Sequence, residues 1–181
     1  MTIETSYLVG DPEPFDETLR YYFSSNWDDS KTNDVTPVFL SPHGKDSEAA
    51  NLAKEISQAD IKGLKAKALI LFETTENRLD LQRSSAGKLR NGKASVVQIT
   101  IYSRTKHEGF LFAEQINDII QDNYPNTATR IKKSGGSQDS AIVSFEEKGV
   151  TFSEPLVQDK EGLVYVSSGF LTCQWQKVKT S

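Results

Sequence analysis

Apolar and polar positions alternate most clearly between residues 94 and 124, where the period of the pattern changes once. Residues 97–102 alternate apolar and polar side chains, which is typical of a strand with one buried face. After Thr105 the apolar side chains recur at the three- and four-residue spacing of one helix face. Thr105 and Glu108 have the spacing of a capping box that begins a helix, and Pro125 ends it. The pattern therefore predicts a strand followed by an amphipathic helix that packs on a sheet.

The first third of the chain predicts shorter elements. Residues 1–10 are expected to form a loosely held arm, and residues 14–25 have the apolar spacing of a short amphipathic helix. Residues 35–40 predict a strand, and Pro37 places this strand at a sheet edge or at a strand start. Residues 46–62 predict a further helix.

The rest of the chain is rich in strand patterns. Residues 65–73 contain the most apolar run, and because both of its faces are apolar, they predict a central strand. Residues 74–93 predict an extended loop or hairpin arm. Further strands are expected at residues 126–133, 141–145, 150–152 and 163–178, the last with a bulge at Ser167-Ser168-Gly169. The predicted class is α+β, a single mostly antiparallel β-sheet with two or three helices packed on one face, in one domain covering residues 1–181.

Composition and charge change this picture only slightly. The chain is 36% hydrophobic and 25% charged, as in ordinary globular proteins. No apolar run approaches the roughly 20 residues of a membrane helix, and the first residues lack the pattern of a signal peptide, so we expect synthesis in the cytoplasm and no membrane partner. Residues 1–60 carry 4 basic and 12 acidic side chains, whereas residues 61–133 carry 13 and 7. Such asymmetry suits docking on complementary surfaces, copies of the chain included, unless folding intermixes the segments.

Motifs that carry chemistry are weak. Gly87–Ala94 is close to a phosphate-binding loop, but Ala94 lacks the hydroxyl that binds magnesium, and a strand follows where the motif needs a helix. His43 and His107 are isolated from one another and from further metal ligands. Cys173 lies in an apolar strand pattern and is expected in the core. We therefore expect no enzyme, no catalytic residues, no cofactor and no metal.

Two groups of residues are candidates for contacts with other molecules. The arm predicted at residues 74–93 is basic and has no interleaved aromatic residues. This favours contact with a nucleic-acid backbone or a neighbouring subunit over base stacking. The alternative is a solvated loop. The candidate contact residues of the arm are Arg78, Arg83, Lys88, Arg90 and Lys93. Aromatic residues are candidates for a subunit interface, with core packing as the alternative: Tyr21, Trp27, Tyr102 and Trp175.

The order of several short patterns resembles that of the tail terminator (tail completion) proteins of long-tailed phages and related archaeal viruses. In that family a short helix ends near a tryptophan and a Thr-Pro-Val strand follows. An Arg-x-Gly segment then leads to a Gln-Ile-x-Ile strand and a Glu-Gly-x-x-x-Ala-x-x-Ile helix. The residues that stand in these places are Leu19–Phe23 with Trp27, Thr36–Phe39, Arg90-Asn91-Gly92, Val97–Ile101, and Glu108-Gly109 with Ala113 and Ile116. The family closes with a Val-x-Phe strand and a long strand ending near tryptophan, here Val150–Phe152 and Phe170–Trp175. The chain departs from the pattern in its inserted residues 41–65.

This resemblance implies a virion structural protein of the tail–neck region. Such a protein forms a homo-oligomeric ring, commonly a hexamer, that caps the tail tube, stops its polymerisation and joins it to the head. The implied partners are the tail-tube protein and the head or neck connector proteins, and the basic arm would face genomic DNA in the lumen or a neighbouring subunit. The alternatives are another head–tail connector or neck subunit, a nucleic-acid-binding module, and an enzyme or nucleotide-binding domain built on Gly87–Ala94.

Overall fold

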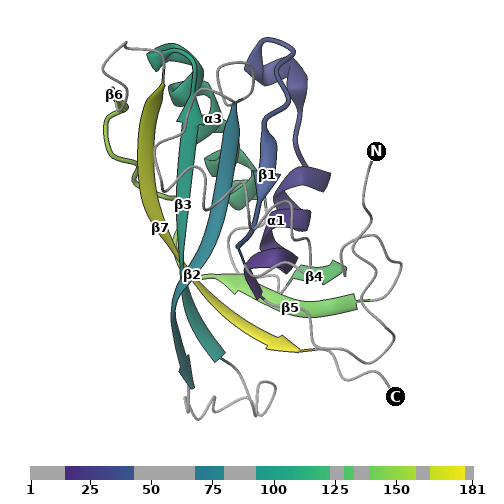
Figure 1. Ribbon diagram of the computed structural model, residues 1–181. Helices are drawn as coiled ribbons and strands as arrows, with labels where there is room; N and C mark the ends of the chain where they lie inside the picture. Colours follow the sequence, from purple (N-terminus) through teal and green to yellow (C-terminus); the bar gives the residue numbers. More distant parts are fainter. Residues whose placement is uncertain are drawn as a thin grey trace.

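The computed structural model of the protein describes residues 15–42, 68–79, 93–122, 129–132, 139–157 and 164–177. The predicted arm at residues 1–10 and the predicted helix at residues 46–62 lie outside these ranges. The described chain has an α+β fold, in which helices α1 (Phe15–Ser25) and α3 (Lys106–Asp122) pack on one face of a mostly antiparallel sheet (Figure 1). The predicted fold class is therefore confirmed.

The described part of the sheet contains seven strands. Its order is β1-β2-β3-β7-β5-β4, with β6 pairing with β7 outside this path, and the pairing of β1 with β2 is parallel. Because β5 and β6 pair with opposite ends of β7, the two strands share one of its edges. The strands are β1 (Val38–Leu40), β2 (Leu69–Leu79), β3 (Lys93–Ser103), β4 (Thr129–Lys132), β5 (Asp139–Phe145), β6 (Leu156–Val157) and β7 (Tyr165–Lys177).

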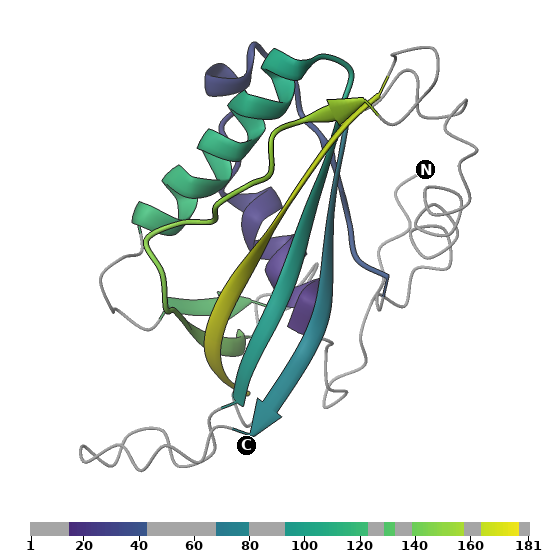
Figure 2. The ribbon, with the colours of Figure 1, turned by 90° about the vertical axis from the view of Figure 1, so that its left-hand side faces the viewer.

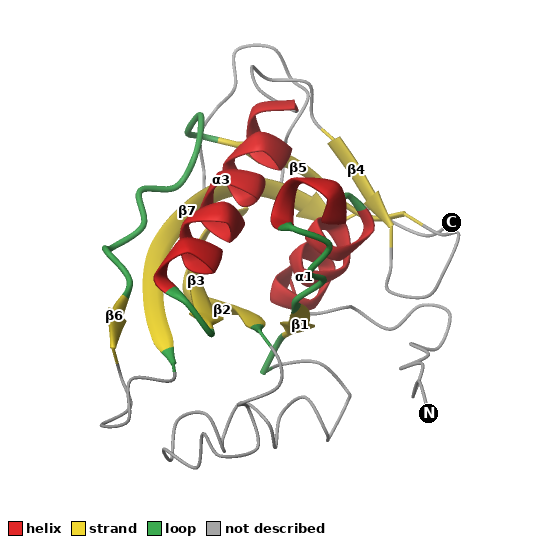
Figure 3. Ribbon diagram, turned by 90° about the horizontal axis from the view of Figure 1, so that it is seen from above, coloured by secondary structure: helices red, strands yellow, loops and turns green. Residues whose placement is uncertain are grey.

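The main core lies between the two helices and the sheet. Figure 3 shows from above how the strands curve around one side of the helices. The apolar spacing of residues 14–25 is realised in α1, whose buried face packs against β2, where Phe23 stacks on Phe72 with ring centroids 5.1 Å apart. Burial of each such side chain stabilises the fold by about 1.5–3 kcal/mol. The largest fully buried side chains are Phe23, Phe72, Phe112, Leu19, Leu69, Ile70, Ile99, Ile101, Ile116, Ile120 and Leu171.

A smaller apolar cluster lies on the other face of the sheet. Side chains alternate between faces along a strand, so Leu69 and Leu71 are directed away from the helices while Ile70 and Phe72 face them. Both pairs are buried. This explains why the run Ala68–Phe72 lacks an apolar–polar alternation, and it confirms the prediction of a central strand, since β2 lies between β1 and β3.

The segment between β5 and β6, residues 146–155, is here called the strap. It runs back along α3 beside the edge of β7 (Figure 2). Ser153 fastens it to β7, because its N–H donates to the carbonyl of Ser168 at 2.9 Å and its carbonyl accepts from the hydroxyl of Ser167 at 2.6 Å. The predicted strand at residues 150–152 is therefore wrong: these residues belong to the strap and form no ladder.

The predicted bulge in the last strand is also wrong. The pairing of β7 with β3 continues without a shift from Tyr165 to Trp175. Gly169 instead lets the strap come close, because a Cβ atom at this position would lie 2.4 Å from Cγ1 of Val150. A register shift occurs in β2, between Thr74 and Glu76. The strand continues to Leu79, into the arm predicted at residues 74–93.

Candidate interaction surfaces

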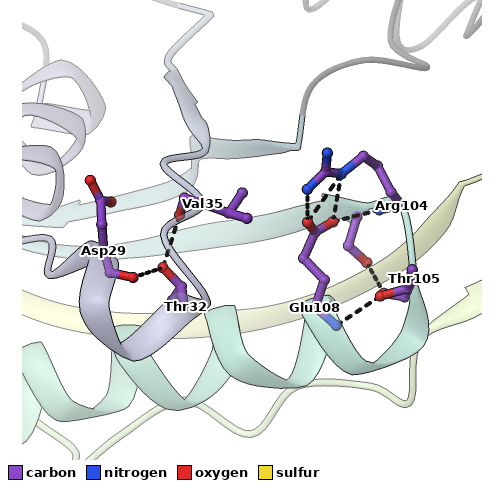
Figure 4. A network of polar contacts seen from close by, with 7 residues as sticks. Asp29, Thr32, Val35, Arg104, Thr105 and Glu108 are labelled. Carbon is purple, nitrogen blue, oxygen red and sulfur yellow. Dashed lines mark hydrogen bonds and ion pairs between the residues drawn. The ribbon is translucent and has the colours of Figure 1, made fainter.

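The start of α3 is held by the residues that the capping pattern singled out (Figure 4). The hydroxyl of Thr105 accepts the backbone N–H of Glu108 at 3.1 Å. The carboxylate of Glu108 accepts the N–H of Arg104 at 2.8 Å and forms an ion pair with its guanidinium group. The hydrogen bond to Glu108, with its negative charge, raises the pKa of Arg104. The predicted capping box is confirmed, except that Glu108 reaches the N–H before Thr105.

Gly109, in the Glu-Gly motif of α3, lies where the helix touches both the sheet and the strap. A Cβ atom at this position would lie 2.8 Å from the hydroxyl oxygen of Ser103 and 3.4 Å from Cγ of Pro155. Ser103 ends β3, and Pro155 ends the strap just before β6. The absence of a side chain therefore allows α3 to begin close to β3 and β6.

Trp27 connects the segments at the beginning of the chain to α3. Its ring lies edge-on to Phe39 of β1 and to Phe112 of α3, with centroids 5.2 Å and 5.6 Å apart. The indole is half-buried and packs against the main core. Trp27 therefore packs on the core of the folded chain, and its contact with a second subunit stays a prediction.

Trp175 is also part of the core. Its side chain is only 6% exposed, and its ring stacks on Phe15 with centroids 4.5 Å apart and an interplanar angle of 5°. The indole N–H donates to the hydroxyl of Ser95 at 2.7 Å. Trp175 thus joins the end of β7 to the start of α1 and to β3, and its ring is not available as a surface contact of the folded chain.

The two tyrosines among the interface candidates are half-buried and lie on different sides of the molecule. Tyr21 is on α1, in the helical layer. Tyr102 packs against the small cluster on the other face of the sheet. Burial raises the pKa of Tyr102, and the nearby negative charge of Glu73 raises it further. The structure does not bring these two aromatic side chains together.

The basic segment falls partly within the described residues. Arg78 lies near the end of β2, where it pairs with Ala94, and Lys93 begins β3, where it pairs with Leu79 and with Trp175. The two ends of the segment are thus brought side by side by the β2–β3 pairing, at the end of the sheet opposite β1. Arg83, Lys88 and Arg90 lie outside the described residues.

A group of exposed apolar side chains was missed by the sequence reasoning. Leu156 is 67% exposed, Val157 52% and Phe110 46%. The contact of Gly109 with Pro155 places the start of α3 beside β6, so these three residues share one corner of the molecule. Phe110 lies off the apolar stripe of its helix, which is the one signal that could have found it. The fourth exposed large apolar side chain among the described residues is Phe170, on β7.

The described residues contain no group of three or more side chains that could together hold a metal ion. Cys173 is fully buried, as expected, and burial raises the pKa of its thiol well above the usual value. His107 is exposed at the start of α3, and His43 lies outside the described ranges. No helix in the described part of the chain is long and apolar enough to cross a membrane.

Comparison of the chain with known protein families and with curated protein sequences found no match.

Proposed function

We propose that this protein is a ring-forming tail terminator of a long-tailed phage or related archaeal virus. Copies of the chain form a closed ring, commonly of six, that caps the tail tube, stops its growth and joins it to the head or neck. The tail-tube protein and the connector proteins are its partners, and the basic segment at residues 78–93 faces either DNA in the lumen or a neighbouring subunit. In this proposal the chain acts by assembly rather than by catalysis.

The observation that carries the proposal is the packing of Trp27 between Phe39 and Phe112. These residues come from three of the segments on which the resemblance rests: the helix end near tryptophan, the Thr-Pro-Val strand and the Glu-Gly helix. Three patterns that are separate and short in the sequence therefore meet in one core. The α+β fold with its helices on one face also agrees with a single packed unit spanning these patterns.

Other residues of the Glu-Gly helix support the same proposal. Glu108 holds the helix start, Gly109 permits the close contact with Ser103, and Ile116 is fully buried against the sheet. Three positions of the pattern therefore have a structural task in joining α3 to the sheet. A chance match in a degenerate pattern would not have to place its residues in this way.

The test is the mass of the full chain in solution, measured by light scattering over a range of concentration and salt. We expect a closed ring, either alone or after addition of the tail-tube protein of the same virus, and electron micrographs of tubes that stop growing and carry a cap at one end. A chain that stays monomeric with the tail-tube protein overturns the proposal.

The same experiment separates the alternatives. A ring that binds the head connector but leaves tube growth unchanged would indicate another neck subunit. A monomer whose affinity for DNA falls steeply with salt would indicate a nucleic-acid-binding module, because phosphate contacts release counterions. Nucleotide binding that is lost in the Lys93→Ala variant would indicate a nucleotide-binding domain built on Gly87–Ala94. The ring proposal instead expects this variant to assemble.

A further inference from the structure

At one end of the sheet a single row of paired residues crosses five strands. Val38 of β1 pairs with Leu69, Leu69 with Tyr102, Tyr102 with Val166, and Val166 with Leu156 of β6. Paired residues have their side chains on the same face, so the row forms an apolar band on the face without α1 and α3. The band ends at both edges of this part of the sheet, because no described strand pairs with the outer side of β1 or of β6.

Leu69 is buried and Val38, Tyr102 and Val166 are half-buried, and only the last residue of the band is largely exposed. Leu69 is 1% exposed, whereas Leu156, the last residue of the row, is 67% exposed. Val157 and Phe110 add two more exposed apolar side chains at the same corner. Sheets that end in solvent protect their edges with short strands, proline or charged side chains. β6 is short and follows Pro155, but both of its side chains are apolar and exposed, as at an edge that another strand continues.

The directions of the strands make the two edges of the sheet compatible with each other. The step from β1 to β2 is parallel, and the steps from β2 to β3, from β3 to β7 and from β7 to β6 are antiparallel. Three reversals leave β6 antiparallel to β1. A second copy placed beside the first by a simple rotation, with its helices on the same face, would therefore bring its β1 antiparallel to β6 of the first.

We propose that β6 of one copy binds β1 of the next, so that the row continues from Leu156 directly to Val38 of a second copy. This inference rests on the ring proposed above and names the contact that closes it. The contact is heterologous, because two different edges of the same chain meet, and such contacts form rings when the rotation closes. A second copy of the chain is the proposed partner, because every copy carries both edges: β6 with Leu156 at one end of the row and β1 with Val38 at the other.

The small size of the contact favours a closed ring over a dimer. A stable interface buries about 1,600 Å² in total, contributed by about 20–30 residues a side. In contrast, β1 has three residues and β6 has two. One such junction is therefore too small to hold two copies together. In a closed ring each copy makes two junctions, so we expect monomers and rings at equilibrium, with few dimers.

Cysteine cross-linking of the full chain tests the junction. Chains carrying Val38→Cys are mixed with chains carrying Leu156→Cys under mild oxidation, in the presence of tail-tube protein if assembly requires it. The native Cys173 is fully buried and does not compete. Opposed residues of an antiparallel pair have Cα atoms about 4.5–5.5 Å apart, within the range of a disulfide. The matched control is Phe170→Cys, on the same face and 55% exposed, but away from the end of the row.

We expect disulfide-linked pairs in the mixture of the Val38→Cys and Leu156→Cys chains, and none with either chain alone or with the Phe170→Cys control. Chains that carry both substitutions should give a ladder of linked species up to the size of the ring. Efficient linkage of the Leu156→Cys chain to itself would overturn the proposal, because it would show that two β6 edges meet.

The Leu156→Glu variant gives a second readout that does not depend on oxidation. This side chain is exposed, so the variant is expected to fold with an unchanged circular dichroism spectrum and to lose the ring, while Phe170→Glu retains it. A closed ring without the expected cross-link, or a ring of Leu156→Glu chains, overturns the junction and leaves the proposed function standing. A chain that remains monomeric with the tail-tube protein overturns both.

Discussion

Asn117 of α3 bonds both backbone polar groups of Val150 in the strap. Its side-chain Nδ2 donates to the carbonyl oxygen of Val150 at 3.1 Å, and its Oδ1 accepts the N–H of Val150 at 2.6 Å. The amide side chain thus satisfies both backbone groups of Val150, as a neighbouring strand does in a β-sheet. A Cβ atom on Gly149 would lie 2.8 Å from Oδ1 of Asn117, so the approach depends on a glycine beside Val150.

Replacement of Asn117 by alanine should destabilise the protein. It leaves the two backbone groups of Val150 without their partners, and Val150 itself is 4% exposed. We expect a loss of about 1–3 kcal/mol in the free energy of unfolding, measured from urea denaturation. The matched control is Gln121→Ala, on the exposed side of the same helix. Equal losses in the two variants would show that the bonds to Val150 contribute nothing specific.

Replacement of Gly169 by alanine should destabilise the protein by overpacking, because it adds a methyl group where there is no space for one. The added methyl group would lie 2.4 Å from Cγ1 of Val150 and 2.8 Å from the carbonyl oxygen of Thr151. We expect a cost of about 1–3 kcal/mol. Because the first contact disappears in a Val150→Ala background, the two substitutions together should cost less than the sum of their separate effects, as a double-mutant cycle measures. Strict additivity would contradict this account.

The start of α3 should be sensitive to the capping hydroxyl. Thr105→Ala removes the acceptor for the N–H of Glu108 and should cost about 0.5–2 kcal/mol, whereas Thr105→Ser keeps the hydroxyl and should cost much less. Thermal unfolding followed by circular dichroism measures both. The control is the variant Glu114→Ala, which changes an exposed residue further along the same helix and measures a general loss of helix stability. Similar losses for the alanine and serine variants would argue against a role of the cap.

Stability at high pH should depend on Tyr102. Burial, and then the charge of Glu73, raise the pKa of its phenol in the folded chain above the value of the unfolded chain. The neutral phenol is therefore favoured by folding, and its contribution is fully present below the unfolded pKa of about 10 and is lost as pH rises through the folded pKa.

Tyr102→Phe should accordingly lose less stability than the native chain as pH rises above about 10, the unfolded phenol pKa. The measurement is the urea midpoint of both proteins as a function of pH. Ultraviolet titration of the folded Glu73→Gln variant should show the phenol ionising at lower pH, because one cause of the shift has been removed. Superimposable pH profiles for the native chain and Tyr102→Phe would refute the assignment.

Much of the secondary structure was predictable because its signals are local. The apolar spacing of residues 14–25 and the change of period near Thr105 became α1, β3 and α3 almost at the predicted boundaries. The hydroxyl and carboxylate of the capping box lie within four residues of their partners, so their spacing alone shows what they can bond. The buried character of Cys173 followed from its apolar neighbours in the same way.

Other features depend on segments that are distant in the sequence, and only the tertiary structure decided them. Val150–Phe152 has the composition of a strand, but it is bonded by the side chain of Asn117 and packs beside Gly169, so it forms the strap. The sequence leaves Trp175 as a candidate for a subunit interface. In the fold its ring stacks on Phe15 and its N–H donates to the hydroxyl of Ser95, so the ring is buried. The exposed corner at Leu156 arises where the sheet ends, a position that no local pattern marks.

The sequence by itself determined the periods and the cap of α3, because these depend on interactions between residues a few positions apart. The tertiary structure decided strand order, the parallel pairing of β1 and the apolar row from Val38 to Leu156, because these depend on which backbone groups and side chains meet across the whole fold. A strand pattern specifies which residues alternate, but hydrogen-bond partners from other segments specify its neighbours and therefore its edges.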